Sequence, residues 1–220
     1  FPIWELTVNF KKNYANIIRN IEGKELKKYI DFSGEAAASN LFTIDPFKNV
    51  INEVLDRDGI RALIYQESLG YEGLRQTISE HFWKGSVNKN DILIVSGAQQ
   101  GIDIASKALI NVNDGVVVEN PTYSGALNVF KWRRANIFEV SVKHDGMDLD
   151  ELEKIVKKNK IKCVYLMSYF QNPTGSSYSK SKKRRLLNMA EIYDFYIIED
   201  DYLSELIYND REYLKIGRAS

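Results

Sequence analysis

Residues 161–208 decide the fold, and they read IKCVYLMSYF QNPTGSSYSK SKKRRLLNMA EIYDFYIIED DYLSELIY. An apolar run is followed by a polar turn with proline and glycine, an amphipathic segment, and a second apolar run that ends in carboxylates. This order predicts one strand–helix–strand unit. Because ligands bind outside the carboxyl ends of the strands in an open α/β sheet, we expect Asn172 and Asp200 to lie near each other and to face one ligand.

Upstream of this unit, strands and helices alternate in the same way. Strands are predicted at 92–95, 115–119 and 137–142, and helices at about 98–109, 124–134 and 148–158. Crossover connections of this kind join parallel strands. The sequence therefore predicts an α/β fold, with a three-layer αβα arrangement around a mainly parallel sheet.

The N-terminal third is less regular. Tyr14–Ile21 has the apolar spacing of a short helix, and Tyr29–Phe32 is a short strand candidate. We divide the chain into an N-terminal arm or linker with its helix at 1–32 and the α/β part at 33–220.

A further helix is predicted after residue 44. Asp45 can cap it, Pro46 can occupy its first position, and Gly59 can end it. Its apolar residues form a stripe that we expect to be buried, made of Phe47, Val50, Ile51, Val54 and Leu55.

Composition and charge narrow the classes of function. The 220 residues carry 30 basic and 30 acidic side chains, so the formal net charge is zero. A segment that binds nucleic acid by itself usually has a basic excess, and the basic run at 180–185 is expected to be a solvated helix face. The single cysteine, Cys163, excludes an internal disulfide and gives no metal cluster. Because no secretory signal or membrane-length apolar run is evident, we expect a cytoplasmic location and no membrane partner.

Four polar turns follow four predicted strands, at 96–100, 120–123, 171–175 and 200–202. Each turn taken alone has a simpler explanation, because Gly, Pro, Asn and Asp are turn residues for backbone reasons. The carboxyl ends of parallel strands meet at one edge of a sheet, so four polar turns at that edge favour a binding site.

The residue types in these turns suit a flat heteroaromatic phosphate. Ser96-Gly97-Ala98-Gln99 leads into a helix, whose first N–H groups can bind an anion. Asp200 follows a fully apolar strand, and a carboxylate there needs a cationic or hydrogen-bonding partner, such as a protonated ring nitrogen. Tyr123 and Tyr202 offer aromatic faces and hydroxyl groups. The alternatives are a helix cap or a surface position for Asp200, and simple packing for the two tyrosines.

These motifs resemble those of the class I/II aminotransferases, which are pyridoxal-phosphate enzymes of fold type I. The motifs that carry the resemblance, in the family's order and separation, are Tyr65 to Arg75, Ser96-Gly97-Ala98-Gln99-Gln100, Glu119-Asn120-Pro121-Thr122-Tyr123, Asn172-Pro173-Thr174-Gly175 and Glu199-Asp200-Asp201-Tyr202. The resemblance implies that 33–220 is an incomplete fold type I large domain, preceded by an N-terminal helical segment.

Two groups within this family resemble the chain most. They are the kynurenine/aminoadipate-type aminotransferases and the aminotransferase-like domains of MocR-type GntR regulators. Asp-Asp-Tyr without an intervening proline favours the regulators, whereas Asn-Pro-Thr-Gly favours the ordinary aminotransferases.

The resemblance implies pyridoxal 5'-phosphate as the cofactor and a residue set that holds its phosphate. The turn of Gly97, Ala98 and Gln99 would bind the phosphate through backbone N–H groups. Tyr65 would reach the phosphate in the partner subunit of a homodimer, since the family's sites lie at a dimer interface. The family also implies that Asn120-Pro121 and Asn172-Pro173 are cis.

The resemblance implies that four further side chains contact the ring. Tyr123 would stack on the pyridine ring, Asn172 would donate to the ring 3-oxygen, and Tyr202 would do the same. Asp200 would pair with the protonated ring nitrogen and keep the ring an electron acceptor. Asp200 and Tyr123 are therefore the implied catalytic residues.

One residue that the family needs has no match in these 220 residues. A lysine on a Ser-x-x-Lys-like turn forms the Schiff base, and its position would lie after Ser220. Because that lysine is both covalent anchor and proton carrier, we expect the chain by itself to be inactive. Two family strands that insert between 92–95 and 195–199 would also lie there. The segment at 92–95 is therefore expected to be displaced, to pair with the last strand, or to meet a neighbouring chain.

Two functions fit these observations. In the first, the chain is the N-terminal part of an aminotransferase that moves an amino group between an amino acid and a 2-oxo acid. In the second, it is the effector-sensing domain of a GntR/MocR-type regulator, in which a winged helix before Phe1 would bind DNA. A dinucleotide-binding module is disfavoured, because no Gly-x-Gly-x-x-Gly follows a strand.

Overall fold

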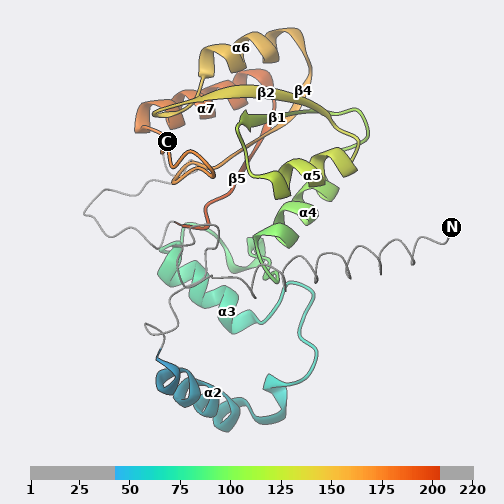
Figure 1. Ribbon diagram of the computed structural model, residues 1–220. Helices are drawn as coiled ribbons and strands as arrows, with labels where there is room; N and C mark the ends of the chain where they lie inside the picture. Colours follow the sequence, from blue (N-terminus) through green and yellow to red (C-terminus); the bar gives the residue numbers. More distant parts are fainter. Residues whose placement is uncertain (1–42, 204–220) are drawn as a thin grey trace, which may run out of the picture. The chain divides into compact units, whose positions relative to one another are not determined.

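The computed structural model describes residues 43–203 (Figure 1). These residues fall into two compact units that divide between Tyr65 and Gln66, and each unit is described by itself. The predictions for Tyr14–Ile21 and Tyr29–Phe32, and the boundary predicted after residue 32, lie outside the described residues.

The described part of the first unit, residues 43–65, contains one long helix. This helix, α2, spans Ile44–Asp58, and the short 3-10 helix η3 spans Gly59–Ala62. Gly59 ends α2, as predicted, with a positive φ of 55°. Thr43, and not Asp45, is the residue that precedes the first turn, and Asp45 lies inside that turn.

The predicted burial of the apolar stripe of α2 is wrong for the described residues. No residue of α2 is buried, and Phe47 and Val50 are 59% and 57% exposed. An apolar stripe becomes buried only where another element covers it. Among residues 43–65 only η3 accompanies α2.

The second unit contains a five-stranded sheet among its described residues, with the order β3-β2-β1-β4-β5 (Figure 1). The strands are β1 (Gly115–Asn120), β2 (Asn136–Lys143), β3 (Gly146–Met147), β4 (Ile161–Leu166) and β5 (Tyr196–Glu199). β1 pairs in parallel with β2 and β4, β4 pairs in parallel with β5, and β3 is antiparallel to β2. The mainly parallel sheet predicted from the alternation is confirmed.

Two pairs of helices cover the two faces of this sheet (Figure 1). They are α4 (Ala98–Leu109) with α5 (Ser124–Trp132), and α6 (Leu149–Lys158) with α7 (Lys180–Tyr193). Alternate residues of a strand point to opposite faces. Val117 accordingly packs in the core with α6 and α7, whereas Val116 and Val118 pack with α4 and α5. This is the predicted three-layer αβα arrangement.

Local polar contacts fix where the helices of the α6–α7 layer begin and end. The Asp148 carboxylate accepts hydrogen bonds from backbone N–H groups at the start of α6, and the Ser179 hydroxyl does the same at the start of α7. α7 ends at Asp194, which takes the left-handed conformation with φ 53° and ψ 56°. No helix within residues 43–203 is long and apolar enough to cross a membrane.

The predicted strand at 92–95 is wrong, because these residues do not join the sheet. They follow the 3-10 helix η5 (Lys89–Asp91), and the Ile94 N–H donates to the Leu69 carbonyl at 3.0 Å. Gly70 lets the two segments approach, since a Cβ there would lie 2.6 Å from Ile94 Cβ. Of the three outcomes expected for 92–95, the structure shows displacement.

The segment before η5 is held by a buried arginine. α3 (Glu72–Thr77) continues into the π-helical turn η4 (Ile78–Phe82). The Arg75 guanidinium donates to the Lys89 carbonyl at 3.1 Å and to the Glu67 carboxylate at 2.8 Å. The arginine therefore ties together residues on both sides of α3.

Cys163 lies at the centre of the sheet. It belongs to β4, which is flanked by β1 and β5, and its side chain is fully buried. Burial raises the pKa of its thiol to about 12. The thiol is therefore neutral and enclosed, as expected for a core residue.

Candidate functional site

The predicted turns at 96–100 and 200–202 meet beyond the carboxyl end of β5, whereas the turns at 120–123 and 171–175 follow β1 and β4 at the same edge of the sheet without lining the pocket found there. This pocket has a volume of about 360 Å³, and we call it the Asp200 pocket. Its lining residues are Ala98, Gly101, Ile102, Ile198, Glu199, Asp200, Asp201 and Tyr202. Three residues singled out from the sequence, Ala98, Asp200 and Tyr202, thus share one pocket. The peptide bonds Asn120-Pro121 and Asn172-Pro173 in the neighbouring turns are both cis, as predicted.

Asp200 is held in place at the end of β5. Its side chain is 9% exposed, and its Oδ2 accepts a hydrogen bond of 2.8 Å from the Tyr165 hydroxyl. Its backbone N–H donates to the Leu166 carbonyl at 2.9 Å, which fixes it beside the end of β4. Burial raises the pKa of Asp200, and the hydrogen bond from Tyr165 opposes that shift.

No cation contacts Asp200 within the described residues 43–203. A buried carboxylate with a single hydrogen-bonding partner is costly. A positively charged group in the pocket would lower that cost. The carboxyl group is therefore suited to a cationic ligand atom.

The start of α4 forms the opposite part of the site. Gly97 precedes the helix with φ 152° and ψ 169°, a conformation that favours glycine. The side-chain oxygen of Gln100 accepts from the Ser96 N–H at 2.6 Å. The N–H groups of Ala98 and Gln99 lie in the first turn, where no intrahelical acceptor exists and the helix dipole is positive. These groups can bind a phosphate.

Tyr123 lies against Gln99 at the start of α5. Its hydroxyl contacts the side-chain oxygen of Gln99 at 3.3 Å, and the Gln99 amide nitrogen donates to the Gly125 carbonyl at 3.2 Å. A Cβ at position 125 would lie 2.4 Å from the Tyr123 ring and 2.5 Å from the Gln99 side chain. The glycine therefore makes room for the pairing of Tyr123 with the start of α4.

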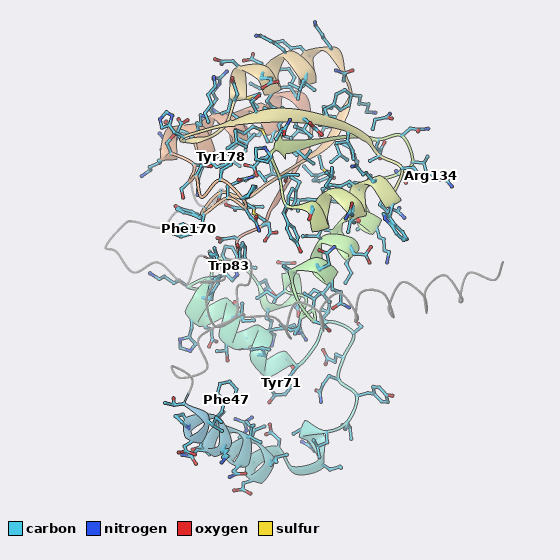
Figure 2. The ribbon with its side chains drawn as sticks, viewed as in Figure 1. Phe47, Tyr71, Trp83, Arg134, Phe170 and Tyr178 are labelled. Carbon is cyan, nitrogen blue, oxygen red and sulfur yellow. The ribbon has the colours of Figure 1, made fainter. Side chains whose placement is uncertain are left out.

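Asn172 lies in the loop between β4 and α7, the same loop that carries the labelled Phe170 and Tyr178 in Figure 2. Its backbone N–H donates to the Met167 sulfur at 3.3 Å. Its side-chain amide has no hydrogen-bonding partner among residues 43–203, so it is available to a ligand. Asn172 and Asp200 are thus both tied to residues at the end of β4, namely Met167 and Leu166.

Tyr65 is fully exposed and belongs to the first compact unit. Its contact with the phosphate of a partner subunit stays a prediction. Tyr202 lines the Asp200 pocket with its side chain partly exposed. Its contact with the ring 3-oxygen stays a prediction too.

Behind this site lies a carboxyl group whose role the sequence does not predict. Glu119, at the end of β1, is 1% exposed. It accepts hydrogen bonds from the Tyr178 hydroxyl at 2.7 Å, the Met167 N–H at 3.1 Å and the Gln171 amide at 3.2 Å. Burial raises the pKa of Glu119 to about 7, and the three hydrogen bonds oppose that shift. The available signal was a carboxylate directly after Val116–Val118, which demands buried partners.

Lys183 is the second buried charge behind the site, and it shows that the predicted solvated face at 180–185 is wrong at this position. Its side chain is 1% exposed, because the ammonium group turns inward. Its Nζ donates to Ser168 at 3.2 Å and lies 3.6 Å from the centre of the Tyr169 ring. The Ser168 hydroxyl in turn donates to Glu199. Burial lowers the pKa of Lys183 to about 8, and the carboxylates of Glu199 and Asp201 oppose that shift.

Comparison with known proteins gives one consistent family. The family model described as aminotransferase class I and II matches residues 36–219. Aromatic-amino-acid aminotransferase 1 of Thermococcus litoralis is 30% identical over 220 residues, which cover 92% of this chain and 53% of that protein. An uncharacterized HTH-type transcriptional regulator of Bacillus subtilis is 30% identical over 187 residues, which cover 83% of this chain and 42% of the regulator.

Solved structures show the same similarity in three dimensions. The crystal structure of an alpha-aminoadipate aminotransferase from Thermus thermophilus, complexed with N-(5'-phosphopyridoxyl)-L-leucine, matches with a TM-score of 0.79 and 30% identity. The match covers 85% of this chain and 47% of that one. The chain spans about half the length of the proteins that it matches.

Proposed function

The chain belongs to the class I and II aminotransferases, and from that premise we propose that it supplies the cofactor-binding part of a pyridoxal-phosphate-dependent aminotransferase. The whole protein would move an amino group between an amino acid and a 2-oxo acid. Support comes from the matched family and from the similar structure that holds a phosphopyridoxyl compound.

The observation that carries the proposal is the environment of Asp200. This buried carboxyl group has no cationic partner among residues 43–203, and it shares its pocket with Ala98 at the start of α4. The pocket therefore combines a carboxylate that needs a cation with a helix start that can hold an anion. A protonated pyridine with a phosphate arm supplies both.

Each side chain has a distinct task in this proposal. The N–H groups of Ala98 and Gln99 bind the phosphate, and Tyr123 orients the ring by stacking. Asn172 donates its free amide to the ring 3-oxygen, and Asp200 holds a proton on the ring nitrogen. The chemistry that pyridoxal phosphate supplies when bound is an aldehyde carbon that takes up the amino group and a ring that withdraws electrons.

Binding of pyridoxamine 5'-phosphate tests the proposal directly, because that form needs no Schiff base with a lysine. We expect the 220-residue chain to bind it and the Asp200→Asn variant to bind it about tenfold more weakly, since a charged hydrogen bond is lost. Isothermal titration calorimetry measures both affinities. Glu191→Gln removes an exposed acid from α7 and is the matched control. No binding by the wild-type chain, or equal binding by the Asp200→Asn variant, contradicts the proposal.

A second candidate is the effector-sensing domain of a GntR/MocR-type regulator. It is favoured by the similarity to the HTH-type transcriptional regulator of Bacillus subtilis. The protein made from the complete reading frame distinguishes the two. Transfer of an amino group to a 2-oxo acid without DNA binding supports the enzyme, and DNA binding that responds to an amino acid supports the regulator.

The proposal extends to assembly and location. We propose that the whole protein is a homodimer in which Tyr65 contacts the phosphate of the partner subunit, and that it resides in the cytoplasm. Sedimentation of the whole protein and fractionation of its host cell measure these two properties. A monomer that retains full cofactor affinity would contradict the role of Tyr65.

A further inference from the structure

Glu119 connects two turns that lie at the same edge of the sheet as the Asp200 pocket, those after β1 and β4. Glu119 is the penultimate residue of β1, and the turn with Tyr123 follows Asn120. All three donors to the Glu119 carboxylate come from the loop between β4 and α7, namely Met167, Gln171 and Tyr178. That loop carries Asn172, so a single buried carboxylate touches both segments that carry proposed ring contacts.

Gln171 extends this connection. Its amide nitrogen donates to Glu119 at 3.2 Å and also to the Pro121 carbonyl at 2.7 Å. Its amide oxygen accepts from the Thr174 N–H at 3.0 Å and from the Thr174 hydroxyl at 2.6 Å. Because both ends of the amide are used, its orientation is fixed. Glu119, Gln171 and Pro121 therefore hold the two turns against each other.

The chemistry of this cluster requires an acceptor at position 119. The Met167 N–H and the Gln171 Nε2–H groups can only donate, whereas a hydroxyl can also turn and accept. An apolar side chain at this position would leave two buried N–H donors without acceptors, which is unfavourable. A glutamine would keep one oxygen for these donors and could donate its own amide to the Tyr178 hydroxyl. Leucine and glutamine at position 119 should therefore have different effects.

We propose that Glu119 is a positioning residue, which acts through Gln171 to hold the turns of Tyr123 and Asn172 in register for the cofactor ring. The inference rests on the proposed function, because it assumes that the cofactor binds between these turns. Glu119 itself lies on the α6–α7 side of the sheet, among residues that are buried. It acts on the site only through Gln171 and the strand end.

The experiment uses three variants and two measurements on the 220-residue chain. Glu119→Leu removes the acceptor, Glu119→Gln retains part of it, and Leu152→Ala destabilises the same core from α6 without touching either turn. Hydrogen exchange of the Thr174 and Gly175 amides reports the turn, since both amides donate to Gln171. Calorimetric titration with pyridoxamine 5'-phosphate reports the site.

For Glu119→Leu we expect exchange of these two amides to rise about tenfold or more, while the Leu152 amide in α6 is unchanged. The affinity for pyridoxamine 5'-phosphate should fall about tenfold. Glu119→Gln should recover most of both effects. Leu152→Ala should lower the melting temperature but leave the affinity within about twofold of wild type.

Three results would overturn the inference. One is faster turn exchange with an unchanged affinity, which would make Glu119 structural only. Another is uniformly faster exchange of all amides in Glu119→Leu, and the third is a loss of affinity in Leu152→Ala of the same size. If the wild-type chain binds no pyridoxamine 5'-phosphate, the proposed function fails and the cofactor part of the inference fails with it. The exchange data alone then decide whether Glu119 holds the turns.

Discussion

Buried charged groups lie on both faces of the sheet at the same edge, but they differ in the number of protein partners that they contact. On the α4–α5 side, Asp200 has one side-chain hydrogen bond, from Tyr165. On the α6–α7 side, Glu119 accepts three hydrogen bonds, and Lys183 is surrounded by Ser168 and an aromatic ring. Buried charge therefore has two uses in this molecule. Groups rich in protein partners support the fold, and a group left short of partners in a pocket is suited to a ligand.

The largest expected effect that tests this comparison is the pH dependence due to Glu119. Its pKa rises from 4.5 to about 7 on folding, so the folded state binds the proton more tightly. The resulting stabilisation is fully present below pH 4.5 and is lost as the pH rises through 7, by about 3 kcal/mol in total. Tyr178, the group that faces it, stays neutral in this range, because burial raises the pKa of its hydroxyl further.

Urea unfolding of wild type and Glu119→Gln across that pH range measures the effect. The difference in free energy of unfolding between the two proteins should shift against wild type as the pH rises. A difference that is constant with pH would show that Glu119 is not protonated more readily in the folded state.

A smaller loss of stability is expected from Lys183→Met. The change leaves the carboxylates of Glu199 and Asp201 without the ammonium that attracts them, and we expect a loss of about 2 kcal/mol at neutral pH. Chemical unfolding measures it. Arg184→Met removes an exposed cation from the next position of the same helix and should change stability by less than about 0.5 kcal/mol. Equal effects of the two variants would contradict a supporting role for Lys183.

The smallest expected effect has the opposite sign. Asp200→Asn should stabilise the chain by about 1 kcal/mol at neutral pH, because it removes a buried charge whose pKa is raised by burial and keeps an acceptor for Tyr165. Thermal unfolding without ligand measures this change. Stabilisation together with weaker binding of pyridoxamine 5'-phosphate would show that Asp200 serves ligand binding, in contrast to Glu119 and Lys183, which support the fold. A loss of stability would place Asp200 among the supporting groups.

The sequence predicted the parts of the fold that depend on local pattern. The strands at 115–119 and 137–142, the two strands of the unit at 161–208 and the crossover helices follow from apolar runs, polar turns and helical spacing, and the structure confirms them. The segment at 92–95 has the same apolar character and still forms no strand. Its state depends on a pairing partner that is distant in sequence, and the local pattern carries no information about that partner.

The site likewise has features that the sequence predicts and features that only the fold reveals. The convergence of Ala98, Asp200 and Tyr202 on one pocket was predictable, because parallel strands bring their ends to one edge. The partners of Glu119 lie 48, 52 and 59 residues away, and no local signal identifies them. The prediction for Lys183 is wrong for a related reason. A run of basic residues on a helix is usually solvated, and only the fold shows which one of them turns inward.

The enclosed thiol of Cys163 makes the labelling rate of this cysteine a measure of how often the sheet opens. It is the single cysteine of the 220 residues, and it is fully buried with a thiol that is neutral at physiological pH. A thiol reagent can reach it only after β4 separates from the neighbouring strands. The labelling rate therefore reports how often this separation occurs. A reporter cysteine introduced on an exposed helix face would meanwhile react at once. Dyes could therefore be attached to the surface without first removing the natural cysteine.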